Sequence, residues 1–439
     1  MANKCLLLLL DGLGDRGHPE LGGQTPLQAA RTPNLDRIAR LGANGLFHAG
    51  LQGQAFPSEK AHFALFGYSQ EEFPGRGLLE ALGHGLEPGP KDVALLAHLA
   101  SASERQGCLF LEREAPEAPR QEDLDQLLDA LPPPETEGIF ARFHPVRDHF
   151  GILLLQGEVS PWITDTNPMQ DGVFVPDLLP REGLAANEAP RARNTARALK
   201  RYLVRVYAAL KDHPVNARRI SEGLCPLNAL ITQRPGAYIP VAPFADRYGL
   251  RGASVASGAV YRGLASFLGL KAVRAQDGTD PGADLAERLE TAFRLLPEHD
   301  FIHVHTKAPD AAAHGKDPRR KKEVIQALDR GLGDFDPERI LQENILLALT
   351  SDHSTPSSGS LVHSGEPVPL ALLSAGSRRD DVARFEESGC ARGCLGLIRG
   401  REFMYTVLNM LDRAKLAGVM DTPLDQPFWP GKRTPFSLT

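Results

Sequence analysis

Acidic and histidine side chains follow apolar runs at two places in the second half of the chain. The segment LLALTSDHSTPSSGSLVHSGEPVPLAL places Asp352, His353 and His363 among small residues, between two apolar stretches. The segment DFIHVHTKAPDAAAHGKD contains Asp310 and His314, which would share one face of a helical turn because they are four positions apart. Both segments therefore offer metal ligands just after a strand-like run.

A third apolar run, CLLLLLDGLGD, ends on Asp11 and brings the set to three carboxylates and three imidazoles. This mixture suits Zn²⁺ or Mn²⁺, whereas Ca²⁺ and Mg²⁺ prefer oxygen ligands alone. Six ligands are too many for one tetrahedral ion. They predict two ions, about 3.5–4 Å apart, that clamp the attacking and leaving oxygens of a phosphoryl transfer. One Asp-His pair alone is more often a capped turn, so the prediction depends on the combination.

Such a site needs a nucleophile, and the segment QAFPSEKAHFALFGY supplies Ser58 at the start of a predicted helix. At a helix N-terminus, the free backbone N–H groups and the helix dipole favour a phosphate group. The alternative role for Ser58 is a simple N-cap, which is the commoner fate of such a serine. His62, on the face that follows Ser58, is expected to be a structural histidine or a contact to the site.

The three apolar runs are predicted to be parallel strands, because each is short, nearly continuous and followed by a polar turn. Between them lie amphipathic helical patterns such as PNLDRIARL and GADLAERLETAFRLL. Alternating strands and helices predict an α/β fold with a mostly parallel sheet between helices, whose ligands bind at the carboxyl ends of the strands. Residues 86–219 differ, with an acidic, proline-rich section and a long basic helix. They are interpreted as a smaller α+β domain inserted into a core formed by residues 1–85 and 220–439.

Composition excludes several classes of function. A net charge of −6 provides no basic field for a nucleic acid. No apolar run approaches the roughly 20 residues of a membrane span, and the first apolar run is too short for a signal peptide. The five cysteines have neither a zinc-binding spacing nor an even number, so reduced thiols and a cytoplasmic protein are expected. No protein partner is predicted.

Several phrases of the chain resemble one known family. They are DGLGDRGHPELGGQTPLQAARTPNLDRIARLGANGLF, AHFALFGYSQEEFPGRGLLEALGHG, HPVNARRISEGLCPLNALITQRPG, FIHVHTKAPDAAAHG and TSDHSTPSSGSLVHSGEPVPL. The chain looks like the archaeal-type branch of the cofactor-independent phosphoglycerate mutases, in the alkaline phosphatase superfamily. The resemblance extends over nearly the whole chain, and it implies an alkaline-phosphatase-like α/β core.

The resemblance also implies a reaction, the glycolytic interconversion of 3-phosphoglycerate and 2-phosphoglycerate without 2,3-bisphosphoglycerate. In the family, a serine takes the phosphoryl group from the phosphoglycerate and returns it to the other hydroxyl of the bound glycerate. Two Mn²⁺ or Zn²⁺ ions are expected as cofactors. Carried over to this sequence, one ion is held by Asp310, His314 and His363, and the second by Asp11, Asp352, His353 and the oxygen of Ser58.

The chain departs from the family pattern mainly at arginines. The phrase Gly-Ser-Asp-Thr-Ala-His becomes Pro-Ser-Glu-Lys-Ala-His, which places Lys60 close to the nucleophile. In the inserted domain, Arg-Cys-Asn-Phe-Ala-Thr becomes Leu-Ala-His-Leu-Ala-Ser at residues 96–101, an arginine-rich phrase becomes Leu-Glu-Arg-Glu-Ala-Pro at residues 111–116, and His-Arg becomes His149 and Phe150. Guanidinium forks are the natural clamp for carboxylate and phosphate, so these losses put the substrate in question.

Other residues are then assigned to the reaction. Lys60 and Arg76 are expected to assist catalysis. The alternative for Lys60 is a solvated surface lysine, which is the commoner fate, and each of the remaining arginines has the alternative role of a surface residue or a structural ion pair. The predicted substrate contacts are Arg147, His149, Arg218 and Arg262.

Three functions stay open on the sequence. The first is the phosphoglycerate mutase. The second is a hydrolase of phosphomonoesters or phosphonates, or a mutase that acts on another phosphorylated substrate, since water would compete for the phosphoserine without the arginine clamp. The third is a non-catalytic sensor or binding protein on the same fold, which would have no reason to keep Ser58 beside six metal ligands.

Overall fold

The computed structural model describes residues 2–438, which divide into two units. The first comprises residues up to Phe73 and from Val241 onward, and the second is Pro74–Pro240. The predicted boundaries of the inserted domain, residues 86 and 219, both fall inside the second unit. The difference arises because the helix just before residue 86 packs on the second unit's sheet, and the strand after residue 219 pairs with that sheet's longest strand.

The first unit is an α/β structure around an eight-stranded sheet with the order β11-β10-β12-β1-β13-β14-β2-β15. Neighbouring strands are parallel except where β14 pairs with β13 and with β2. The prediction of a mostly parallel sheet is therefore confirmed. The strands are β1 (Lys4–Leu10), β2 (Ala43–His48), β10 (Gly252–Ala256), β11 (Lys271–Arg274), β12 (Phe301–Thr306), β13 (Ile345–Thr350), β14 (Val368–Leu373) and β15 (Gly396–Arg399).

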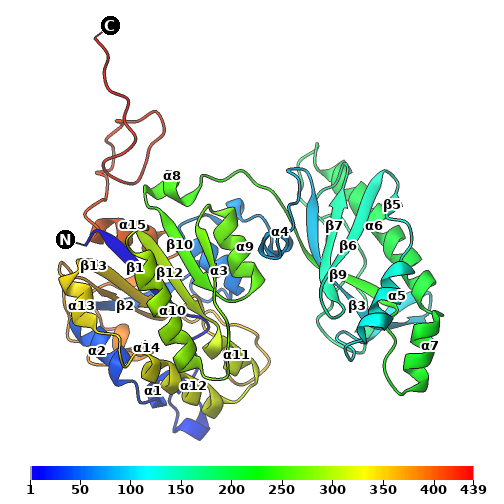
Figure 1. The fold of residues 1–439 in the computed structure, drawn as a ribbon, viewed down its shortest axis with the longest axis horizontal. Coiled ribbons are helices and arrows are strands. Elements are labelled where there is room, and N and C mark those ends of the chain that lie inside the picture. The colour runs from blue at the N-terminus through cyan, green and yellow to red at the C-terminus, as the bar shows by residue number, and fades with distance from the viewer. Residues whose placement is uncertain (1, 439) are drawn as a thin grey trace. The chain divides into compact units, whose positions relative to one another are not determined.

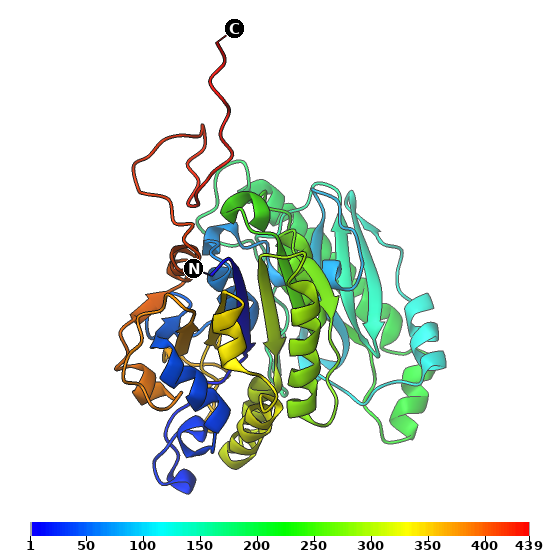
Figure 2. The ribbon, with the colours of Figure 1, turned by 60° about the vertical axis from the view of Figure 1, so that its left-hand side comes forward.

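Helices cover both faces of this sheet (Figures 1 and 2). Leu6, Leu8 and Leu10 of β1 pack with α2, α10, α12 and α13 on one face. On the other face the ring of Phe66, just after α3, meets the rings of Phe244 and Phe301. The helices are α1 (Pro26–Ala29), α2 (Pro33–Leu41), α3 (Ser58–Leu65), α8 (Phe244–Tyr248), α9 (Ala259–Phe267), α10 (Pro281–Leu295), α11 (Ala308–His314), α12 (Pro318–Gly331), α13 (Pro337–Gln342), α14 (Glu387–Cys390) and α15 (Glu402–Met410), with 3₁₀ turns at Pro19–Leu21 and Gln70–Glu72.

The second unit is an α+β structure built on a seven-stranded antiparallel sheet, in the order β5-β6-β7-β3-β4-β8 with β9 paired to β3. Its core lies between the sheet and α6, whose buried residues include Leu199 and Tyr202. The elements are α4 (Arg76–Gly83), β3 (Val93–Arg105), β4 (Cys108–Arg113), α5 (Gln121–Asp129), β5 (Glu135–Thr136), β6 (Ile139–Arg147), β7 (Phe150–Gln156), β8 (Val173–Phe174), α6 (Ala189–Leu210), α7 (Pro214–Ser221) and β9 (Ala229–Ala237).

None of the helices within residues 2–438 is both long enough and apolar enough to cross a membrane.

Candidate active site

Three neighbouring strands deliver the three predicted acids to one edge of the first unit's sheet. Strand β1 lies between β12 and β13, parallel to both, with Leu10 opposite Thr306 and Leu9 opposite Thr350. Asp11 directly follows β1, Asp310 lies in the short helix α11 after β12, and Asp352 follows β13 by two residues. The carboxyl ends of adjacent parallel strands meet at the same edge, which is where ligands bind in such folds.

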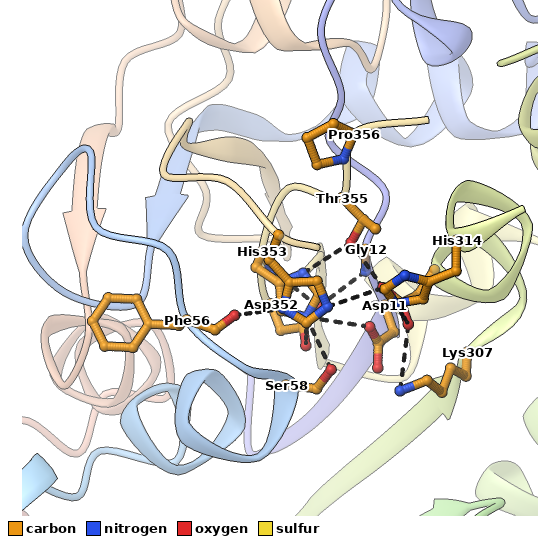
Figure 3. A network of polar contacts seen from close by, with 12 residues as sticks. Asp11, Gly12, Phe56, Ser58, Lys307, His314, Asp352, His353, Thr355 and Pro356 are labelled. Carbon is orange, nitrogen blue, oxygen red and sulfur yellow. Dashed lines mark hydrogen bonds and ion pairs between the residues drawn. The ribbon is translucent and has the colours of Figure 1, made fainter. Parts of the chain in front are cut away.

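The histidines join these acids in one cluster (Figure 3). The three acids and His353 are buried, His363 is partly buried, and the His314 side chain is 39% exposed. Nε2 of His314 lies 3.2 Å from Asp310 Oδ2, as the four-residue spacing on α11 predicted, and Nε2 of His363 lies 3.5 Å from Asp310 Oδ1. Nε2 of His353 lies 3.1 Å from Asp352 Oδ2 and 3.6 Å from Asp11 Oδ1. The six predicted ligands thus form two groups, one around Asp310 and one around Asp11 and Asp352. The rings of His353 and His363 stack between the groups, with their centroids 3.8 Å apart.

Ser58 enters this cluster from α3. It is the first residue of that helix, only 4% exposed, and its Oγ lies 2.9 Å from Nε2 of His353. Ser58 thus lies in the first turn of α3, where the helix dipole favours negative charge. The structure brings all seven predicted ligand residues together, while their role as ligands stays a prediction.

Hydrogen bonds to Thr355 fix the orientation of the His353 ring. The Thr355 hydroxyl donates to Asp310 Oδ1 at 2.8 Å, so its oxygen is left to accept from Nδ1 of His353 at 3.1 Å. Nε2 then faces Ser58 and the two carboxylates. A ring held in this way, through the nitrogen that does not bind the metal, is the usual arrangement of a metal-binding histidine.

The charges of the cluster are unbalanced in a way that a cation would correct. Burial works to lower the pKa of His353, but Asp352, Asp11 and Asp310 outweigh it and raise this pKa to about 9. Burial works to raise the pKa of Asp310, yet hydrogen bonds from His314 and His363 lower it. In the metal-free protein, a proton on His353 thus supplies positive charge that a divalent ion would replace.

Unpaired carboxylate oxygens give a direct test of whether metal ions fit. Asp11 Oδ1, Asp310 Oδ2 and Asp352 Oδ2 are buried and unpaired in the sense that none accepts a well-aligned hydrogen bond within the described chain. Their neighbours, at 3.1–3.6 Å, are histidine nitrogens and, for Asp310, also the Lys307 ammonium. Buried carboxylates are usually fully hydrogen-bonded or bound to a metal. One such oxygen on each of three acids, beside histidine nitrogens, therefore fits two divalent cations.

Hydrogen bonds from Lys321 connect the loops that carry these groups. The buried Lys321 ammonium donates to the carbonyls of Gly14 and Thr355 at 2.8 Å and to Asp15 Oδ2 at 3.0 Å. Gly12 allows the loops to approach each other, because a Cβ there would lie 2.6 Å from Thr355 Oγ1 and 2.7 Å from Cβ of Asp310. Its φ of +65° also favours glycine.

Four further residues contact the cluster, and only His62 among them was named from the sequence. Tyr261 of α9 and His305 of β12 both contact Asp11. Lys307 Nζ lies 3.3 Å from Asp310 Oδ2. His62, predicted to be structural or a contact to the site, lies with Nδ1 2.8 Å from the Ser58 carbonyl and 3.3 Å from Asp352 Oδ2. His305 had a signal, since it alternates with His303 in a buried strand; Tyr261 had none.

Two of the other predicted residues lie in the first unit. Lys60 follows Ser58 on α3, and its Nζ lies 5.6 Å from the centre of the Phe73 ring. Arg262 lies on α9, next to Tyr261. Neither residue has a described contact to the carboxylates, and their roles stay predictions.

The remaining predicted residues belong to the second unit. Arg76 begins α4 and its NH2 group lies 3.1 Å from Glu80. Arg218 forms an ion pair with Asp123. Arg147 is largely exposed and lies 3.7 Å from Asp148. His149 is buried. These positions agree with the alternative of structural ion pairs for Arg76 and Arg218, and substrate binding by the four residues is untested.

Comparison with known proteins identifies the family. Residues 3–410 match the model described as the Metalloenzyme superfamily. The protein named 2,3-bisphosphoglycerate-independent phosphoglycerate mutase 2 of Methanocaldococcus jannaschii is 38% identical over 423 residues, which is 95% of each chain. The 2,3-bisphosphoglycerate-independent phosphoglycerate mutase of Methanopyrus kandleri is 37% identical and covers 95% of this chain and 99% of its own.

Solved structures agree with this relationship. A protein of Pyrococcus horikoshii matches with a TM-score of 0.76 and 30% identity, over 95% of this chain and all of its own. The cofactor-independent phosphoglycerate mutase of Thermoplasma acidophilum matches with a TM-score of 0.64 and 27% identity, over 94% of this chain and all of its own. The chain therefore belongs to the Metalloenzyme superfamily and, within it, to the family of the archaeal 2,3-bisphosphoglycerate-independent phosphoglycerate mutases.

Proposed function

We propose that this protein is an isomerase that interconverts 3-phosphoglycerate and 2-phosphoglycerate through a phosphorylated Ser58. The observation that carries the proposal is the position of the seryl oxygen, 2.9 Å from His353 Nε2 and beside a cluster of carboxylates with unpaired oxygens. The names of the relatives support the same reaction.

Two divalent ions, Mn²⁺ or Zn²⁺, are the proposed cofactors. When bound, they would lower the pKa of the seryl hydroxyl and offset the charge of the transferring phosphoryl group. Asp310, His314 and His363 would hold one ion, and Asp11, Asp352, His353 and Ser58 would hold the other. The ligand atoms lie closest together as Asp310 with His353 and His363, and as Asp11 with Asp352 and His353, so His353 faces both positions.

The protein's own groups would act in two symmetrical transfers. Ser58 Oγ loses its proton and attacks phosphorus, so a P–O bond to Ser58 forms, the P–O bond to the substrate's C3 oxygen breaks, and a proton passes to that oxygen. The C2 hydroxyl of the bound glycerate then loses its proton and attacks the phosphoserine. A P–O bond to the C2 oxygen forms, the P–O bond to Ser58 breaks, and a proton returns to Ser58 Oγ. Throughout, the first-turn N–H groups of α3 favour the negative phosphoryl oxygens.

Arginine, lysine and histidine side chains are proposed to surround the substrate. Lys60 and Arg76 are proposed to assist catalysis, and the proposed contacts to the phosphoglycerate are Arg147, His149, Arg218 and Arg262. The cytoplasmic location inferred from cysteine usage also stays a prediction.

The test follows both products at once by phosphorus NMR, after 3-phosphoglycerate is added to the Mn²⁺-loaded protein. We expect 2-phosphoglycerate with little free phosphate, and no product from Ser58→Ala. Ser374→Ala is the matched control, because this buried serine bonds only with the nearby Ser377 among the described hydrogen bonds. Free phosphate as the main product would favour the hydrolase instead, and equal turnover by Ser58→Ala would contradict the proposed nucleophile.

A further inference from the structure

The carboxylate of Asp11 has two oxygens with opposite surroundings. Oδ2 accepts two hydrogen bonds, from the Tyr261 hydroxyl at 2.7 Å and from Nε2 of His305 at 2.9 Å. Oδ1 accepts none from the described chain and faces Nε2 of His353 at 3.6 Å. All four side chains are buried.

Both partners of Oδ2 act as hydrogen-bond donors. The Tyr261 hydroxyl has one proton and donates it to Asp11 Oδ2. Nδ1 of His305 has no partner in the described chain, whereas Nε2 lies 2.9 Å from a carboxylate oxygen, which accepts, so Nε2 is the donor. Oδ2 is thus occupied by protein groups, and Oδ1 is left for a cation on the other side.

Asp352 repeats this division with different donors. Its Oδ1 accepts from the backbone N–H groups of Gly12 and His353, each at 3.0 Å, and its Oδ2 is one of the unpaired oxygens. Backbone donors are present in any sequence of this fold. For Asp11, by contrast, the same task depends on two side chains from other elements, Tyr261 of α9 and His305 of β12.

We propose that Tyr261 and His305 are positioning residues that restrict Asp11 to metal binding through Oδ1 alone. By occupying Oδ2, they prevent the carboxylate from rotating to present both oxygens or from turning away from His353. The Tyr261 hydroxyl also accepts from Lys307 Nζ at 3.4 Å, and this ammonium lies 3.3 Å from Asp310 Oδ2, so Tyr261 contacts the surroundings of a second acid. Removing a hydrogen-bond partner of a metal ligand typically lowers metal affinity about 10- to 100-fold.

The test is calorimetric titration of the metal-free protein with Mn²⁺. We expect Tyr261→Phe, which removes only the hydroxyl, to weaken one of the two ions by about tenfold or more and to change the other less than about twofold. Repeating the titration in a His314→Gln background, in which the ion at Asp310 is already weakened, assigns the loss to the ion at Asp11. His305→Leu should have the same effect, and His305→Gln, which keeps an N–H donor, a smaller one.

Tyr68→Phe is the matched control, because it removes a buried hydroxyl that donates to the Ala242 carbonyl at 2.8 Å, with no described contact to the cluster. It should leave both Mn²⁺ affinities unchanged. The proposal is wrong if Tyr261→Phe and His305→Leu both bind two ions with parental affinity, or if they weaken both ions equally.

This inference rests on the two-metal site of the proposed function but not on its substrate. A parental protein that binds two Mn²⁺ ions and turns over no phosphoglycerate would contradict the proposed function and leave the titration result valid. A parental protein that binds no Mn²⁺ would contradict both.

Discussion

The surroundings of one buried histidine of the first unit, His353, contrast with those of two in the second unit, His98 and His149. His353 of the first unit has carboxylates as neighbours, and they raise its pKa to about 9 against the effect of burial. In the second unit, burial lowers the pKa of both His98 and His149 to about 4. Their rings pack on Phe150, with centroids 5.1 and 4.4 Å away. Burial thus lowers the pKa of His98 and His149, whereas around His353 the combined effect of three carboxylates outweighs burial.

The first unit's His353 lies beside carboxylates that can bind cations, whereas the second unit's His98 and His149 pack against an aromatic ring. In the first unit, each acid keeps an unpaired oxygen close to the histidines. In the second, His149 has no hydrogen-bond partner at either ring nitrogen within the described residues, and its low pKa leaves it uncharged at neutral pH. If His149 contacts a phosphoglycerate, as the sequence predicts, it would do so as a neutral hydrogen-bonding group.

The largest expected effect is that of removing the charged histidine. His353→Gln should lower turnover of 3-phosphoglycerate by about 10³-fold, since several kcal/mol of charge stabilisation depend on the ion it would bind. Turnover and Mn²⁺ stoichiometry are measured together. In the second unit, His98→Leu is the counterpart, and a loss of turnover as large as that of His353→Gln would contradict the distinction between the two units.

A pH titration of stability tests the second unit. The pKa of His98 is lower in the folded state than the usual value near 6.5, so above pH 6.5 neither state is protonated and the full stability is present. As the pH falls toward 4, only the unfolded state gains the proton, and stability falls by up to about 3 kcal/mol. Hydrogen exchange of second-unit amides at pH 7.5 and 4.5 measures this loss.

His98→Leu provides the control for the titration. It removes the titrating group, so the stability difference between the two pH values should be smaller in the variant than in the parent. An unchanged difference would show that His98 is not responsible, whatever the absolute stability of the variant.

Adding metal should stabilise the first unit and leave the stability of the second unit unchanged. Mn²⁺ at about 100 times its dissociation constant should stabilise the first unit by about 2.7 kcal/mol for each ion. Hydrogen exchange with EDTA or with Mn²⁺ measures this in β1, β12 and β13, with the amides of β6 and β7 as the internal control. Equal protection of both groups of strands would show that the effect is not local to the carboxylate cluster.

The smallest expected effect concerns Lys307. Its ammonium lies 3.3 Å from Asp310 Oδ2 and would repel a divalent ion there. Lys307→Met should therefore tighten Mn²⁺ binding about fivefold, which corresponds to a charge interaction of about 1 kcal/mol. Lys211→Met, at the exposed end of α6, is the control. Weaker Mn²⁺ binding by Lys307→Met would mean that the lysine orders Asp310 rather than competing with the ion.

The sequence predicted the elements that end on acids better than it predicted their neighbours. Apolar runs that stop at Asp11 and Asp352 are local signals, and the structure has strands there. That β1 lies between β12 and β13 depends on long-range pairing, which no local pattern encodes. The contact of Tyr261 with Asp11 joins residues 250 positions apart and had no local signal either.

The domain boundaries illustrate the same limit. Composition changes near residue 86, where the chain becomes rich in acidic residues and proline, but the second unit already begins at Pro74. Helix α4 has an ordinary amphipathic sequence, and only its packing on β3 and β9 assigns it to the second unit. The change in amino-acid composition therefore lies about one helix after the start of the second unit.

Gly12 limits how this site can be altered, in the laboratory or by natural variation. Any side chain there would meet Thr355 and Asp310 at well under contact distance and would have to adopt an unfavourable backbone conformation. A library that randomises the turn after Asp11 should thus return glycine almost alone at position 12. Variants with a changed metal preference would have to carry substitutions at the surrounding side chains. A design that transfers the ligands to another scaffold would likewise need a glycine at the point where the loops that carry the acids approach each other.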